Sequence, residues 1–376
     1  MPKTGTSSIQ ESLFFGLNDP RFEYFTGGEM NTARALILLG SEGDLPAHFD
    51  GERGRHPAFL AAARQAVQQW LGSRLEQATR SGRELIVSGE NCWRMPENEL
   101  RRLKRRLEQT GLQVQVIAYV RPWKEWLESN FSMRAQLNCI YGSNRAPRLT
   151  FAPISSAQID YRNRIETFDR VFGQENVIFR KFQPNTFPEG CVTRDFCRLI
   201  GISLNPSQIR RANESLRLDA VRLIFAYGKF ANQEATSGRV TMWQHCWLMN
   251  RLLTLPGRSL RFHSSVVEPL LQPLLPDLER IEERIGASLR EDWTKHDSGD
   301  CIRTEEDLFR FSDESLVWLE AQTGVRLPRG RPPEESARRA GELIHRLRHS
   351  SPGFRILSQS AMSAAHRSWI RWTRSR

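Results

Sequence analysis

The sequence lacks paired cysteines and any long apolar run. Its six cysteines are scattered without a CxxC spacing, which argues against a zinc site and favours a reducing compartment. No apolar stretch approaches the roughly 20 residues of a membrane-spanning helix, and no basic-then-apolar leader opens the chain. We therefore expect a cytoplasmic protein whose 376 residues suffice for one large domain or two ordinary ones.

The sequence also lacks the GxxxxGKS/T pattern of P-loop kinases. No aspartate with the placement of a magnesium ligand follows any of the predicted strands. These two absences argue against phosphoryl transfer from a magnesium–nucleotide complex.

Negative charge is scarce at one end of the chain. Residues 326–376 contain 12 arginines, no lysine and three glutamates, so they carry +9 of the formal net charge of +11. The other 325 residues are nearly balanced, so the composition predicts a basic tail and not a basic surface. Pro328, Pro332 and Pro333 mark a linker into this tail, which we expect to be partly disordered or to form amphipathic helices.

Short apolar runs alternate with helical patterns in the first half of the chain. The strongest strand candidates are 84–89, 114–120 and 177–182. Helices are predicted between and around them, at Ser7–Gly16, Pro57–Ser81, about 96–110, from 123 onward, about 158–172 and 193–201. This alternation predicts an α/β fold with a parallel sheet flanked by helices, whereas the pattern after about residue 212 is wholly helical.

Charged residues follow the predicted strands. Glu90 follows the first, Arg121 the second, and Arg180 and Lys181 end the third. Ligands of open parallel sheets bind at the carboxyl ends of the strands, so we expect these groups to share one crevice. The chain opens with "MPKTGTSSIQ", where small residues and Lys3 suit an anion at a helix start. Together these groups suit transfer of an anionic group from a phosphorylated donor to a hydroxyl.

Several motifs resemble, in order, those of the sulfotransferases that use 3′-phosphoadenosine 5′-phosphosulfate (PAPS). "PKTGTSSIQ" resembles their 5′-phosphosulfate loop, and "VIAYVRPWKEWLESNF" has Arg121 and Ser129 at the family's spacing for the 3′-phosphate. The segments "IDYRNRIETFDRVFGQENVIFRKF", "TRDFCRLIGI" and "RANESL" resemble a bacterial, carbohydrate-sulfotransferase-like branch. The resemblance covers about residues 1–325, the expected catalytic domain, and does not extend to the tail.

The resemblance implies a P-loop-like sulfotransferase fold and a set of site residues. PAPS is the implied co-substrate, with no metal, and the implied ligands are Lys3, Thr4, Gly5, Thr6, Ser7, Ser8, Arg121 and Ser129. Lys3 is also implied as a catalytic cation. In the family a buried strand precedes the loop, where this chain has only Met1 and Pro2. We therefore expect the first strand to be missing, either because the true start lies upstream or because the form is truncated and inactive.

Sulfuryl transfer to a hydroxyl needs a general base. Glu90 is the candidate implied by related carbohydrate sulfotransferases, and His48 and His56 compete with it from a Gly/Asp/Arg-rich loop. The expected acceptor is a carbohydrate or glycolipid hydroxyl. The alternative is an inactive homologue that binds anions, nucleic acid or membranes through its tail. Trp369 and Trp372 with nearby arginines favour an anionic membrane face over nucleic acid as the tail's partner.

Overall fold

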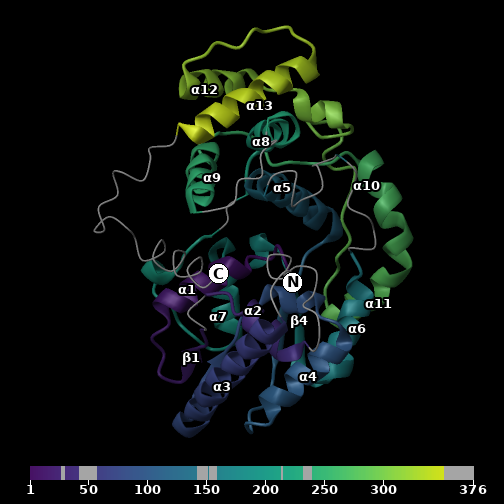
Figure 1. Ribbon diagram of the computed structural model, residues 1–376. Helices are drawn as coiled ribbons and strands as arrows, with labels where there is room; N and C mark the ends of the chain where they lie inside the picture. Colours follow the sequence, from purple (N-terminus) through teal and green to yellow (C-terminus); the bar gives the residue numbers. More distant parts are fainter. Residues whose placement is uncertain are drawn as a thin grey trace. The chain divides into compact units, whose positions relative to one another are not determined.

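The computed structural model describes residues 1–26, 30–41, 57–141, 151, 159–212, 215–231 and 239–350, shown as ribbons in Figure 1. The chain divides into two compact units. Unit 1 comprises Met1–Arg121, Asp160–Asn213 and Asp277–Leu289, and unit 2 comprises Pro122–Ile159, Glu214–Pro276 and Arg290–Arg376. The division predicted at residue 326 does not coincide with this one, because the chain passes between the units at five earlier points.

The strands of the described residues lie in unit 1 and form two separate parallel pairs. β1 (Phe22–Tyr24) pairs with β2 (Glu84–Ile86), and β3 (Val116–Val120) pairs with β4 (Val177–Lys181). The three predicted strands are therefore confirmed, and so is the mixed α/β class. The single sheet that we predicted is instead two pairs, and β1, only three residues long, was not predicted.

The first residue of the chain contacts the edge of β3 that faces away from β4. The Phe182 amide donates to the Val120 carbonyl across the β3–β4 pair. Neighbouring residues of a strand point their backbone groups to opposite edges, so the Tyr119 carbonyl points the other way. That carbonyl accepts a hydrogen bond of 3.3 Å from the Met1 amino nitrogen. Residues 1–5 form no strand.

The helices of unit 1 surround these strands. They are α1 (Thr6–Gly16), α2 (Ala33–Gly40), α3 (Pro57–Ser81), α4 (Glu97–Glu108), α6 (Tyr161–Phe172), α7 (Val192–Leu199) and most of α11 (Leu275–Ile285), with short 3-10 turns η2 (Glu90–Arg94), η4 (Gln174–Asn176), η5 (Pro184–Thr186), η6 (Pro188–Gly190) and η7 (Pro206–Gln208). The predicted helices of this region agree within a few residues. The eight-residue α2 was missed because its apolar residues are nearly continuous and show no helical period.

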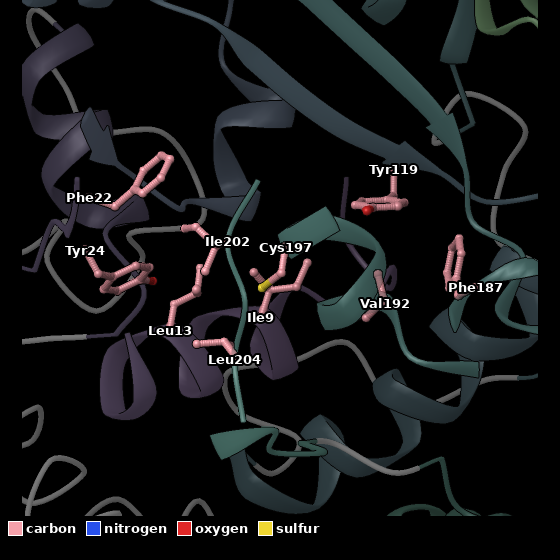
Figure 2. Close-up of a cluster of buried hydrophobic side chains, with 10 residues drawn as sticks. All are labelled: Ile9, Leu13, Phe22, Tyr24, Tyr119, Phe187, Val192, Cys197, Ile202 and Leu204. Carbon is pink, nitrogen blue, oxygen red and sulfur yellow. The ribbon is translucent and has the colours of Figure 1, made fainter. Parts of the chain in front are cut away.

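Figure 2 shows the apolar cluster that fixes α1. Ile9 and Leu13 of α1 lie among side chains from β1, β3, α7, the residue between η5 and η6, and the loop after α7, namely Phe22, Tyr24, Tyr119, Phe187, Val192, Cys197, Ile202 and Leu204. Burying such side chains contributes about 2 kcal/mol each. The first helix is therefore held against residues of both strand pairs.

Unit 2 is helical. Its described residues contain isolated β-bridges but no strand. Its helices are α5 (Trp123–Tyr141), α8 (Leu218–Phe230), α9 (Arg239–Leu252), α10 (Ser264–Leu271), η8 (Gln272–Leu274), η9 (Glu305–Phe309), α12 (Asp313–Thr323) and α13 (Pro333–His349). The wholly helical pattern predicted after residue 212 agrees with this architecture.

The first half of the predicted tail belongs to unit 2. Helix α13 packs along α8 (Figure 1), and a Cβ atom added to Gly341 would lie 2.7 Å from the Ala226 carbonyl oxygen. Arg348 is 1% exposed and donates to the Tyr227 hydroxyl at 2.7 Å. The arginines at positions 329, 331, 338 and 339 of the segment form ion pairs with glutamates. Trp369 and Trp372 lie outside the described residues.

Within the described ranges, none of the helices has both the length and the apolar character needed to cross a membrane. The same ranges contain no group of three His, Cys, Asp or Glu side chains arranged to hold a metal ion.

Candidate functional site

The end of β2 places Glu90 at the start of η2. The Ser88 carbonyl accepts hydrogen bonds from the Thr32 hydroxyl at 2.7 Å and the Thr32 amide at 2.9 Å. A Cβ atom on Gly89 would lie 2.9 Å from the Ala33 Cα, so only glycine allows this approach of the backbone to α2. Glu90 is half-buried. The two residues that precede Glu90 are thus held against Thr32 and Ala33, at the start of α2.

The loop before α1 has an unusual backbone. Lys3 has φ 67° and Gly5 has φ 75°, both in the left-handed region. A side chain at Gly5 would also lie 2.7 Å from Val192 Cγ1, and the Gly5 carbonyl accepts the amides of Ser8 and Ile9 that begin the helix. A lysine held at positive φ costs about 1 kcal/mol or more, which packing must offset.

Arg121 joins this loop to the end of β3. Its Nη1 donates to the Lys3 carbonyl at 3.0 Å, and its guanidinium lies 5.2 Å from the centre of the Phe182 ring. The Arg121 carbonyl in turn accepts from the Tyr161 hydroxyl at 2.9 Å. These contacts fix both the backbone and the charged end of Arg121.

The charges of Lys3, Glu90 and Arg121 act on one another. Burial lowers the pKa of the Lys3 ammonium, the neighbouring charge of Arg121 lowers it further, and the carboxylate of Glu90 raises it in opposition. The structure therefore brings together three residues that lie 31 to 118 positions apart in the sequence. Two cations and one carboxylate meet at the N-terminal end of a helix, where an anion is favoured.

The hydroxyl groups of the loop differ in their environment. Thr4 is buried, and its hydroxyl donates to the Met1 carbonyl at 2.6 Å. The Ser8 hydroxyl accepts the amide of Ala212 at 3.0 Å. Thr6 and Ser7 are half-buried in the first turn of α1. Two of the predicted hydroxyl ligands are thus already bound to backbone groups of the protein.

Arg180 belongs to a buried network that the sequence did not reveal. Asp195 is 1% exposed and accepts Arg180 Nε at 3.0 Å, Arg180 Nη2 at 2.9 Å and the Tyr119 hydroxyl at 2.7 Å. Burial, together with the adjacent Asp195 carboxylate, raises the pKa of Tyr119. This network holds the ends of β3 and β4 to α7. Lys181, also predicted for the crevice, is half-buried at the end of β4.

The other predicted site residues are not brought together with this group by the described contacts. Ser129 lies half-buried on α5, in unit 2. His48 and His56, the alternative bases, lie outside the described residues.

The N-terminal end of α5 is capped by a carboxylate from far along the chain. Glu291 accepts the amide of Lys124 at 2.8 Å and that of Glu125 at 3.2 Å. Burial raises the pKa of Glu291 to about 7, and the nearby acids Glu125 and Glu128 also raise it, while the two amide bonds oppose the shift. No local sequence signal could have paired Glu291 with a helix that begins 168 residues earlier.

Comparisons of the chain with protein-family models, with curated proteins and with solved structures find no match.

Proposed function

We propose that the protein is a sulfotransferase that moves the sulfuryl group of PAPS to a hydroxyl, and that unit 1 has a P-loop-like sulfotransferase fold. The acceptor in this proposal is a carbohydrate or glycolipid. The observation that carries the proposal is the meeting of Lys3, Glu90 and Arg121 beside the first turn of α1. The motif resemblance stated for the sequence points to the same three residues.

Lys3 and the start of α1 would bind the 5′ side of the donor. The amides of Thr6 and Ser7 occupy the first turn, where the helix dipole favours an anion. The Lys3 ammonium would stabilise the charge that grows on the bridging oxygen as the sulfur–oxygen bond breaks. Glu90 raises the pKa of Lys3, which helps to keep the amine protonated despite its burial.

Arg121 would bind the 3′-phosphate. Guanidinium groups match the geometry of phosphate oxygens, and Nη1 of Arg121 is already tied to the Lys3 carbonyl. A side chain that is fixed before binding loses less conformational entropy when the ligand arrives. This arrangement supports a preorganised phosphate contact next to the sulfuryl-binding loop.

Glu90 would act as the general base. In the proposed step the acceptor oxygen bonds to sulfur while the bond from sulfur to the 5′-phosphate oxygen breaks. The acceptor proton passes to the Glu90 carboxylate, and 3′-phosphoadenosine 5′-phosphate leaves. The half-buried position of Glu90 beside Lys3 is consistent with this role.

Thermal unfolding with 3′-phosphoadenosine 5′-phosphate tests the donor site. At 100 times its dissociation constant the ligand should stabilise the fold by about 2.7 kcal/mol, and ADP, which lacks the 3′-phosphate, by much less. Lys3→Ala and Arg121→Ala should each weaken the effect. Lys104→Ala and Arg80→Ala remove partly or fully exposed cations of α4 and α3 and serve as matched controls. Greater stabilisation by magnesium–ATP than by the 3′-phosphorylated ligand would overturn the proposal.

A transfer assay with PAPS and a panel of glycans tests the chemistry separately. Glu90→Gln should lose turnover by about 100-fold or more while retaining the affinity for 3′-phosphoadenosine 5′-phosphate. Unchanged turnover in this variant would remove Glu90 as the base and leave the donor site standing.

A further inference from the structure

Two serines of α1 hold a distant backbone segment by their hydroxyls. The Ser8 hydroxyl accepts the Ala212 amide at 3.0 Å and donates to the Ala212 carbonyl at 3.4 Å. One turn later, the Ser12 hydroxyl accepts the Arg210 amide at 2.8 Å and donates to the Arg210 carbonyl at 3.4 Å. Each hydroxyl thus serves both backbone groups of one residue. We call this pair of serines with residues 210–212 the hydroxyl clamp.

The spacing of the hydroxyl clamp fits both partners. Four residues of an α-helix rise about 6 Å, and two residues of extended chain span about 6.6 Å. Residues 8 and 12 therefore match residues 212 and 210 in opposite directions. Farther along the same face of α1, a Cβ atom on Gly16 would lie 2.7 Å from the Gln208 Cβ, which shows how closely η7 lies against the helix. The segment 208–212 follows α1 back toward the loop that contains Lys3.

The hydroxyl clamp lies next to a point where the chain leaves unit 1. The second segment of unit 1 ends at Asn213, directly after the clamped Ala212. Two more crossing points lie close to the loop of Lys3. Arg121 is the last residue of the first segment of unit 1, and its side chain donates to the Lys3 carbonyl. Tyr161, the second residue of the next segment, donates to the Arg121 carbonyl. Three of the five crossings are therefore hydrogen-bonded to the loop, to α1 or to each other.

We propose that Ser8 is a positioning residue that couples the loop of Lys3 to the segment 208–212 at the exit from unit 1. An anion bound by the amides of the first turn would fix the backbone of Thr6 and Ser7, and Ser8 is the next residue of that turn. Its hydroxyl would then hold Ala212 more firmly, so occupancy of the donor site tightens the point where the chain enters unit 2. This inference rests on the proposed function and assigns Ser8 a role different from direct donor binding.

Hydrogen exchange of the intact protein tests the coupling, with and without saturating 3′-phosphoadenosine 5′-phosphate. In the wild type the ligand should slow exchange at the Arg210 and Ala212 amides by about tenfold. Ser8→Ala should lose this ligand-dependent slowing at Ala212, and Ser8→Thr, which retains a hydroxyl, should restore it. Ser73→Ala removes a hydroxyl that donates to the Gln69 carbonyl of its own helix, and should leave the slowing intact.

The possible outcomes of this experiment distinguish failure of the coupling from failure of the proposed function. If the ligand binds and exchange at Ala212 does not respond, or responds equally in Ser8→Ala, the coupling is wrong while the donor site stands. If calorimetry detects no binding to the wild type, the proposed function fails and the coupling falls with it. A merely structural role for Ser8 would change exchange equally with and without ligand, which also contradicts the proposal.

Discussion

The cluster around Lys3 in unit 1 and the ion pairs of Arg222 and Glu128 in unit 2 use buried charge in opposite ways. In unit 1, Lys3, Glu90 and Arg121 converge at strand ends beside a helix start, and the charge there includes two cations for one carboxylate. In unit 2, Arg222 and Glu128 are each paired with a side chain of opposite charge, and these pairs tie helices to loops. Arg222, 3% exposed, binds both carboxylate oxygens of Asp300, at 2.7 and 3.0 Å, and the Asp307 carbonyl at 3.0 Å.

Glu128 shows the same pattern in unit 2. It is 4% exposed, accepts the Phe262 amide at 3.0 Å and pairs with Arg261. Because a buried charge without compensation costs several kcal/mol, such pairs are strongly constrained by folding. Substitutions of buried charged residues such as Arg222 and Glu128 in unit 2 should therefore change stability, whereas those near Lys3 should change binding more than stability.

The largest expected effect is the loss of Arg222. Arg222→Ala should lower the free energy of unfolding by about 3 kcal/mol, because it removes a buried side chain and leaves the carboxylates of Asp219 and Asp300 without it. Chemical denaturation measures the change. Arg346→Ala, at an exposed position of α13, is the matched control and should have little effect. A loss below about 1 kcal/mol in Arg222→Ala would contradict the contrast between the units.

Gly5→Ala should disturb the loop before α1 and lower the free energy of unfolding by about 2 kcal/mol, because the added Cβ would lie 2.7 Å from Val192 Cγ1 and the backbone has φ 75°. Gly111→Ala is the control, because Gly111 has φ 83° with nothing within 4 Å of the added Cβ. The difference between the two variants isolates the clash from the backbone strain. We expect Gly5→Ala also to lose affinity for 3′-phosphoadenosine 5′-phosphate in calorimetry; unchanged affinity would show that the loop is not part of the donor site.

Glu291 should make the stability of unit 2 depend on pH. Its folded pKa of about 7 lies above the ordinary value of 4.5, so its contribution is full below pH 4.5 and is lost as pH rises through 7. Glu291→Gln resembles the protonated form, so its free energy of unfolding should rise above that of the wild type as pH rises from 4.5 to 7, by about 3 kcal/mol in all. Thermal melts across this pH range measure it, with exposed Glu268→Gln as the control. A constant difference between wild type and variant across the range is the contrary result.

The smallest effect concerns the pH dependence of donor binding. The lowered pKa of Lys3 means that its positive charge is lost at lower pH than that of an ordinary lysine. The affinity for 3′-phosphoadenosine 5′-phosphate should therefore fall severalfold while pH is still below the ordinary lysine pKa of 10.5, and less in Lys3→Arg, because a guanidinium stays charged throughout. Lys104→Arg controls for the general effect of the substitution. Parallel pH profiles in Lys3→Arg and the wild type would exclude Lys3 as the titrating group.

Periodic patterns predicted the elements well where the elements are long. The predicted helix Pro57–Ser81 has the bounds of α3, and the β-branched run at 114–120 contains β3. The three-residue β1 and the almost continuously apolar α2 carry too little periodicity to be recognised. The division into two units was not predictable because the chain crosses between them five times, and of these points only the crossing after residue 213 coincides with a recognised change of pattern.

The site was predictable only as far as strand ends could be located. Glu90 and Arg121 each follow an apolar run, so the rule for parallel sheets placed them together with the loop of Lys3. The partners Asp195, Phe182 and Ala212 were not predicted, because their roles depend on contacts between residues far apart in sequence. Ser8 illustrates the limit: its place in the motif was recognised, but its bond to Ala212 was not.

The close approach of α13 to α8 has a practical consequence for handling the protein. Truncation at the proline cluster near residue 330 would remove the helix that covers Ala226 and Tyr227, both fully buried with much of α8. The shortened chain would present a continuous apolar stripe to water, a surface that promotes self-association and proteolysis. Experiments that aim to remove the basic end should therefore cut after His349, where α13 ends.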